Sequence, residues 1–127
     1  MGLSEAKVGP AIAVSDMQRA KDFYEGKLGL SGGEDTGDGG HTYPCGEGTE
    51  LHIFPASGAG KSESTTAAWE VDDVEATVDE LSANGVTFEQ YDEPLKTDAK
   101  GIAESDNGGV AWLKDPDGNV LAIVGAG

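Results

Sequence analysis

Cysteine and arginine are nearly absent from this chain. Cys45 is the only cysteine among 127 residues, so no disulfide can form within one chain, and a reducing cytoplasm is the expected compartment. Arg19 is the only arginine. Sites for phosphonates or carboxylate-rich conjugates usually use the paired N–H groups of an arginine. Anionic small molecules are therefore disfavoured as ligands.

Long hydrophobic runs and positive charge are also scarce. The apolar stretches are far shorter than the roughly 20 residues of a membrane-spanning helix, so no membrane segment is expected. Lysine and arginine number 8 against 24 aspartates and glutamates, which gives a formal net charge of -16. This charge repels phosphate backbones and excludes nucleic acid as a partner, whereas it favours cationic ligands. The alternative is that the charge serves solubility or adaptation to high salt.

A strand-and-helix pattern occurs twice along the chain. Residues 8–14 and 65–71 alternate as strands do, and each stretch leads into a helical pattern that ends at Gly29 or at Gly85. The positions that match at one constant offset are Val14 with Val71, Asp16 with Asp73, and Met17 with Val74. Two copies are too few for a solenoid, so the repeat predicts one domain built from two related halves.

Three further strands are expected in each half. Their predicted bounds are 31–36, 40–45 and 50–54 in the first half, and 86–91, 109–114 and 119–124 in the second, with a long loop over 94–107. The last two strands flank Asp115-Pro-Asp-Gly118, a strong signal for a tight turn. Because hairpins dominate, the fold class is predicted as α+β. The predicted halves are residues 1–56 and 64–127, joined by a flexible linker over 57–63.

Two details of this pattern concern caps and turns. Ser15 with Gln18, and Asp72 with Glu75, are expected to cap the two helices. Asp38 lies in the Gly-rich stretch 31–49, and its spacing from Asp35 does not match an EF-hand loop. We interpret both aspartates as turn residues.

Three stretches carry a resemblance to a known family. They are residues 14–24 with Leu28-Gly29-Leu30, residues 71–74, and Lys114-Asp-Pro-Asp-Gly-Asn-Val120. In these stretches the chain resembles the vicinal oxygen chelate superfamily, which includes glyoxalases, bleomycin-resistance proteins and extradiol dioxygenases. The resemblance implies two βαβββ modules whose sheets curl into an open cup, with the helices outside. It also implies a homodimer, with a pocket between modules or between subunits.

This sequence lacks the usual metal-binding residues at most of the positions where catalytic members of that family hold a metal. Catalytic relatives hold a divalent metal through one residue from each of four cup-facing strands, usually His or Glu. Here the corresponding positions are Gly9, Thr66 and Ala122, and the fourth strand offers Glu50 or His52. Glycine and alanine have no donor atom, and a catalytic metal generally needs about three protein ligands. We therefore expect no metal and no other cofactor, and a rebuilt divalent metal site that includes His41 is the alternative.

The strand alternation predicts what lines the cup. If the apolar side chains of each strand pack under the helices, the opposite faces form a cavity with a floor of small residues and with aromatic and acidic walls. Such a cavity suits a medium-sized organic molecule. The predicted ligand-binding residues are Gly9, Glu50, His52, Phe54, Thr66, Glu70, Trp112 and Ala122.

The sequence favours a non-catalytic protein of the bleomycin-resistance kind. It would sequester an apolar or cationic aromatic compound, such as an antibiotic or another natural product. Trp112 and Phe54 would stack on this ligand, and Glu50 and Glu70 would attract its charge. The alternative is an enzyme of the family, a glyoxalase-like lyase or isomerase or a dioxygenase-like protein of secondary metabolism, with Glu50 or His52 as general base. A structural or regulatory domain without a small-molecule ligand is a third hypothesis.

Overall fold

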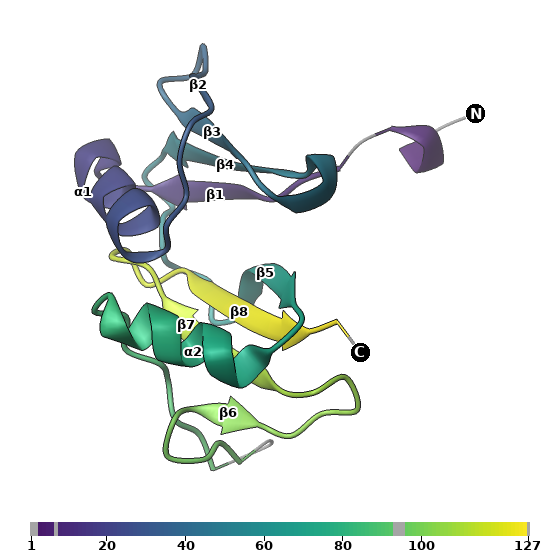
Figure 1. Ribbon diagram of the computed structural model, residues 1–127. Helices are drawn as coiled ribbons and strands as arrows, with labels where there is room; N and C mark the ends of the chain where they lie inside the picture. The colour runs from purple at the N-terminus through teal and green to yellow at the C-terminus, as the bar shows by residue number, and fades with distance from the viewer. Residues whose placement is uncertain (1–2, 7, 93–95, 127) are drawn as a thin grey trace.

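The computed structural model describes residues 3–6, 8–92 and 96–126 and contains two four-stranded open sheets (Figure 1). The first sheet has the order β1-β4-β3-β2, and its strands are Ala11–Val14 (β1), Glu34–Asp35 (β2), His41–Pro44 (β3) and Glu50–Pro55 (β4). The second has the order β5-β8-β7-β6, with Thr65–Val71 (β5), Ile102–Ala103 (β6), Val110–Lys114 (β7) and Val120–Gly125 (β8). One helical segment follows β1 and one follows β5. The predicted α+β class with two βαβββ units is confirmed.

Both helical segments begin one residue later than predicted. The N-caps are Asp16 and Asp73, whose side chains accept hydrogen bonds from the backbone N–H groups three residues on. The first segment consists of α1 (Met17–Lys21) and a π-helical continuation over Asp22–Lys27, and the second is α2 (Val74–Ala83). The two caps occupy equivalent positions of the repeat. None of the helices among the described residues is long and apolar enough to cross a membrane.

The edge of the second sheet differs from the prediction. No strand forms over 86–91, where Phe88 makes a single bridge to Leu113. Instead β6 lies inside the predicted loop 94–107, of which residues 94 and 95 lie outside the described residues, and pairs with β7. The short turn that joins β6 to β7 contains Gly108, whose φ of 102° suits a glycine. This local hairpin takes the edge position because it closes a much shorter loop than residues 86–91 would.

Each sheet has a core face and an open face. The core faces carry the side chains that pack with the helices into one hydrophobic cluster shared by both halves. The six positions that the sequence predicts for these faces are at most 4% exposed, and they are Ile12, Val14, Leu51, Ile53, Leu121 and Ile123. The open faces carry the alternate residues of the same strands.

A buried hydrogen-bond network joins the two halves. The Tyr24 hydroxyl in the first helical segment donates to Asp115 Oδ2 over 2.8 Å, and Asp115 lies in the turn between β7 and β8. The side-chain amide of Asn119 donates to the Ala13 carbonyl oxygen of β1 over 2.8 Å. Burial, and then the charge of Asp115, raises the pKa of Tyr24, so the phenol remains a donor. The tight turn predicted at 115–118 therefore also holds the halves together.

Replacing Tyr24 by phenylalanine tests this network. We expect Tyr24→Phe to lower the free energy of unfolding by about 1–3 kcal/mol, because a buried hydrogen bond to a carboxylate is lost. Chemical denaturation measures the change. Tyr91→Phe is the matched control, since Tyr91 is 36% exposed and its hydroxyl has no hydrogen bond to any described residue, and it should change stability little. Equal effects of the two substitutions would contradict the role of Tyr24.

His41 stabilises the β2–β3 turn through hydrogen bonds at both of its ring nitrogens. Its Nδ1 lies 2.9 Å from Asp35 Oδ1 and its Nε2 lies 2.8 Å from the Gly32 carbonyl oxygen. Both partners are acceptors, so the doubly protonated ring fits this site. The hydrogen bond to Asp35 raises the pKa of His41 above its usual value of 6.5, although partial burial and, less strongly, Lys21 oppose the shift. The same bond lowers the pKa of the exposed Asp35 carboxyl.

These opposite pKa shifts predict that the His41–Asp35 pair stabilises the fold only within one pH range. The contribution of His41 is fully present below about pH 6.5 and is lost as the pH rises through its raised pKa. It is also lost at acid pH, as the pH falls through the lowered pKa of Asp35. We expect the difference in melting temperature between the wild type and His41→Gln to be larger near pH 6 than near pH 8.5. Asp35→Asn should abolish this pH dependence, and an equal difference at both pH values would refute this role of the pair.

Candidate functional site

The open face of the first sheet carries two aromatic rings beside small residues. Ala11 and Ala13 of β1 are in register with His52 and Phe54 of β4. The His52 and Phe54 rings lie 5.6 Å apart between centroids, with a tilt of 36°. Because the neighbouring strand contributes only methyl groups here, both rings remain partly exposed.

The open face of the second sheet has a similar composition. Ala122 of β8 lies in register between Ala68 of β5 and Trp112 of β7. The Trp112 ring packs edge-on against Tyr91, with centroids 5.5 Å apart. Tyr91 was missed as a possible site residue, and the signal available in the sequence was an aromatic residue at the end of the predicted strand 86–91.

The predicted ligand-binding residues fall on two separate surfaces within one chain. Since the core faces of both sheets join one cluster, the open faces lie on opposite sides of this cluster. His52 and Phe54 belong to the first open face, and Trp112 and Ala122 belong to the second. Thr66 lies where the register of β5 shifts, between Thr65 and Ala67. The structure thus does not bring the eight predicted residues into one pocket of a single chain. It brings together Glu50 with Glu70, and Gly9 with Glu50.

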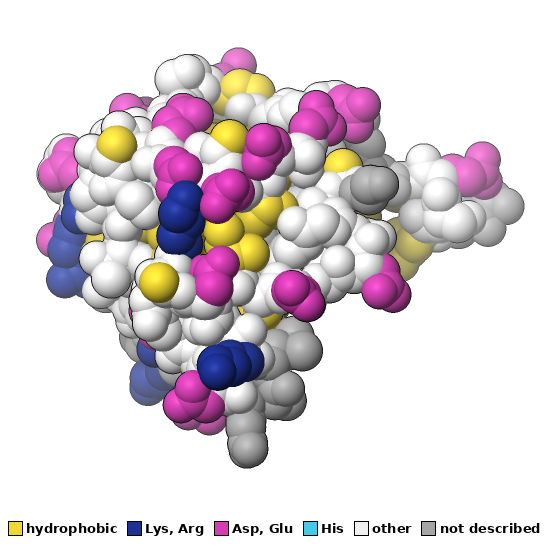
Figure 2. All heavy atoms as spheres, turned by 60° about the horizontal axis from the view of Figure 1, so that its bottom comes forward, with side chains coloured by type: hydrophobic (Ala, Val, Ile, Leu, Met, Phe, Trp, Pro, Cys, Tyr) yellow, Lys and Arg dark blue, Asp and Glu magenta, His cyan; other side chains and the backbone are white. Residues whose placement is uncertain are grey.

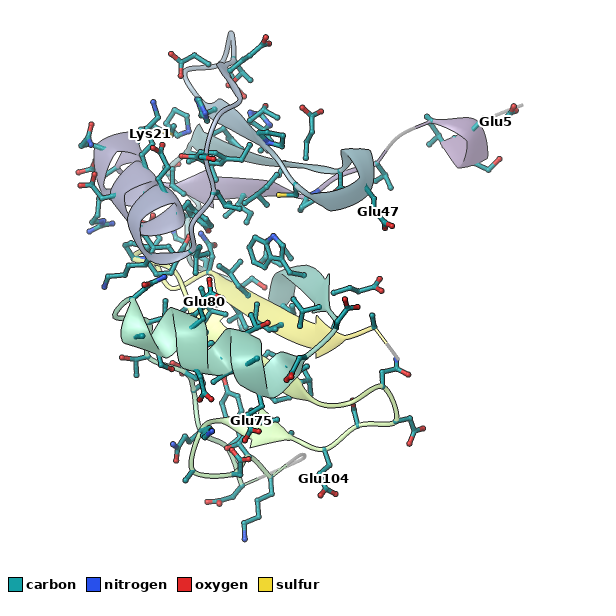
Figure 3. The ribbon with its side chains drawn as sticks, in the orientation of Figure 1. Glu5, Lys21, Glu47, Glu75, Glu80 and Glu104 are labelled. Carbon is teal, nitrogen blue, oxygen red and sulfur yellow. The ribbon has the colours of Figure 1, made fainter. Side chains whose placement is uncertain are left out.

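Glu50 and Glu70 share a hollow between the two halves. This hollow has a volume of about 500 Å³ and is lined by residues of both halves. Its lining combines apolar residues with four acidic ones, and it includes Pro10, Cys45, Glu47, Glu50, Leu51, Ala67, Trp69, Glu70 and Asp72. Glu47 lies in the turn before β4, on the side of the first sheet that faces the second half (Figure 3). Trp69, rather than Trp112, is the tryptophan of this hollow.

A second hollow lies on the open face of the first sheet. Its volume is about 550 Å³, and Thr36, Thr42 and Glu50 are among its lining residues. Thr42 is in register with His52. Asp38, for which the sequence predicts only a place in a turn, lies 3.2 Å from the Nε2 atom of His52. The Asp38–His52 contact was missed because a turn fully accounts for an aspartate in a Gly-rich stretch.

The side chains present do not fit the divalent metal of the catalytic relatives. A Cβ atom at Gly9 would lie 2.9 Å from the Glu50 carbonyl oxygen, so this backbone leaves no room for a ligating side chain. Within the described ranges, no group of three or more His, Cys, Asp or Glu residues could hold a metal ion. Both ring nitrogens of His41 are already hydrogen-bonded, which argues against a rebuilt site there.

Comparison with known proteins identifies the family. The model of the Glyoxalase/Bleomycin resistance protein/Dioxygenase superfamily matches residues 8–123. The chain belongs to this superfamily. No curated protein sequence matches this superfamily member.

Solved structures of other members share the fold. An antibiotic-binding protein, TnmS3 from Streptomyces sp. CB03234, superposes with a TM-score of 0.68 at 24% identity, covering 95% of this chain and 97% of that chain. A glyoxalase/bleomycin resistance protein from the same organism gives 0.67 at 26% identity, with 90% and 95% covered. The fosfomycin resistance protein FosX from Listeria monocytogenes gives 0.67 at 13% identity, with 97% and 94% covered. Antibiotic-binding and resistance proteins are therefore among the structural neighbours of this superfamily member.

Proposed function

We propose that this protein binds and sequesters an apolar or cationic aromatic compound of the antibiotic or natural-product kind, without converting it. The observation that carries the proposal is the pair of open faces, where aromatic rings stand beside alanines and remain partly exposed. Such surfaces suit planar organic molecules, which gain from stacking on aromatic rings. The missing metal ligands and the antibiotic-binding neighbour TnmS3 support the same proposal.

The charge of the surface favours a cation. Acidic side chains are spread over the face in Figure 2, and basic side chains appear there at a few places. The Glu50 and Glu70 side chains are exposed and line the hollow between the halves together with Trp69. A cation over an aromatic ring gains about 0.5–2 kcal/mol, depending on how far it is desolvated. Nearby carboxylates add long-range attraction, which raises the rate of association.

The two open faces lie apart within one chain. A single pocket would form if the first open face of one copy met the second open face of another copy. The outer strands β1 and β5 are each paired on one side, whereas the opposite edges, β2 and β6, contain two residues each. Longer unpaired edges are the natural sites for pairing with another chain. Val8 lies next to β1, is 94% exposed, and lines the hollow between the halves. We therefore propose a homodimer that pairs at these edges. The partner would cover the hollow beside Val8, and its open face would complete the ligand pocket.

Thermal shift with a matched pair of aromatic compounds tests ligand binding. We expect aminoacridine, a planar cation at neutral pH, to raise the melting temperature with concentration, and uncharged acridine to do so less. Trp112→Ala should reduce the affinity for aminoacridine by about 5- to 30-fold, because a stacking partner is lost. The double variant Glu50→Gln with Glu70→Gln should reduce it by about 3- to 10-fold and remove the preference for the cation.

Glu80→Gln is the control for the loss of charge. Glu80 is an exposed residue of α2, on the helix that covers the core face of the second sheet (Figure 3). Its replacement should leave both affinities unchanged. A flat thermal response to aromatic compounds would refute sequestration. Conversion of a bound compound that stops in Glu50→Gln or His52→Gln would instead establish the lyase or isomerase alternative.

Sedimentation velocity tests the homodimer. We expect the wild type to sediment as a dimer at micromolar concentration, and Val8→Lys to shift it towards monomer, because a charge would be buried at the interface. Ser82→Lys places the same charge on an exposed position of α2 and should leave the dimer intact. A monomeric wild type at high concentration would contradict the proposal, and so would equal effects of the two substitutions.

A further inference from the structure

The hydrogen bonds around His52 narrow the chemistry of the ligand, if the protein binds aromatic compounds as proposed above. We propose that His52 presents an unprotonated Nδ1 atom to the ligand, so that the protein selects planar aromatic compounds that carry an O–H or N–H donor. Asp38 and Thr36 act as positioning residues that fix the tautomer of the ring.

The turn between β2 and β3 reaches one nitrogen of the His52 ring. Asp38 Oδ2 lies 3.2 Å from His52 Nε2, and Thr36 Oγ1 lies 3.3 Å from the same atom. The carboxylate of Asp38 is itself held by the Thr36 hydroxyl and by the backbone N–H of Gly40. His52 Nδ1 has no hydrogen-bond partner among residues 3–6, 8–92 and 96–126.

The two side chains beside Nε2 can only accept hydrogen bonds, and this determines which nitrogen of the His52 ring is protonated. The Thr36 hydroxyl donates its only hydrogen to Asp38, so its oxygen can only accept from His52. Hydrogen bonds from Thr36 and Gly40 lower the pKa of Asp38, so this carboxylate is ionised at neutral pH and also only accepts. Both neighbours thus require a hydrogen on Nε2. In the neutral ring, Nδ1 then carries a lone pair.

The His52 ring lies on the face that we propose as the ligand surface. His52 lies on the open face of the first sheet, beside Phe54 and in register with Ala11 and Thr42. Thr36 and Thr42 both line the hollow of about 550 Å³ on this face. His41, the second histidine of the chain, bonds acceptors through both nitrogens and offers no free lone pair.

A free acceptor on an aromatic surface defines a class of ligands. Phenols, aromatic amines and protonated amines can donate to Nδ1, whereas ethers and quaternary ammonium ions cannot. A single neutral hydrogen bond of this kind changes the affinity by about 3- to 10-fold. The class agrees with the net charge of -16, which disfavours anionic ligands.

Nitrogen-15 NMR of the histidine rings tests the tautomer without any ligand. We expect the neutral His52 ring of the wild type to show a protonated Nε2 and an unprotonated Nδ1. The double variant Thr36→Val with Asp38→Ala should give a mixture of the two neutral tautomers. Unchanged His41 signals, from the other histidine of the chain, show that the variant remains folded. A protonated Nδ1 in the wild type, or a tautomer unaffected by the double variant, overturns the positioning role.

Fluorescence titration with naphthol and its methyl ether tests the selection. We expect the wild type to prefer naphthol by about 3- to 10-fold, and His52→Phe to bind both compounds equally. The double variant should weaken this preference for naphthol over its ether, a result that general destabilisation would not give, because destabilisation lowers both affinities alike. Equal binding of both probes by the wild type overturns the inference and leaves ligand binding intact. Binding of neither probe overturns the proposed aromatic-binding function and the inference with it.

Discussion

The buried carboxylate of Asp115 is the contact on which the arrangement of the two halves depends. It is 5% exposed, and a buried charge is costly unless hydrogen bonds compensate for it. Its oxygens accept four hydrogen bonds, from the backbone N–H groups of Asp117 and Asn119, from the Asn119 amide and from the Tyr24 hydroxyl. Three of these donors belong to the β7–β8 turn, and the fourth comes from the other half. The conformation of the turn and the packing of the halves are therefore stabilised together.

This packing determines where a ligand surface can lie. Because the halves meet through their core faces, each open face is left to solvent within one chain. The same turn also occupies part of the free edge of β1, since Asn119 bonds the Ala13 carbonyl oxygen and Asp117 accepts from the Ser15 N–H. The edge that remains lies towards Val8, beside the hollow. A second copy that pairs there is consistent with the proposed pocket between chains.

The sequence predicts well on which side of a strand each side chain lies, but it predicts poorly how the two halves pack against each other. Ile12 and Ile53 were assigned to the core correctly, because burial on one side of a strand imposes a period of two. The prediction of a strand over 86–91 was wrong, because a local hairpin that contains glycines takes the edge position beside β7. The contact of Tyr24 with Asp115 joins positions 91 residues apart, and neither residue type signals such a partner in the sequence. For the same reason the sequence did not indicate that the predicted site residues lie on two surfaces of one chain.

The small residues at the positions that correspond to the metal ligands of catalytic relatives have more than one physical role. At Gly9 the chain passes so close to β4 that a Cβ atom would lie 2.9 Å from the Glu50 carbonyl oxygen, so the glycine allows close packing rather than opening a cavity. At Ala122 the side chain is 2% exposed and lies in register between Ala68 and Trp112, so little empty space is created there either. The interpretation of these positions as space for a ligand is therefore too simple. A ligating side chain at Gly9 would require a shift of the backbone of β1 or β4, so this position cannot match the catalytic relatives by substitution alone.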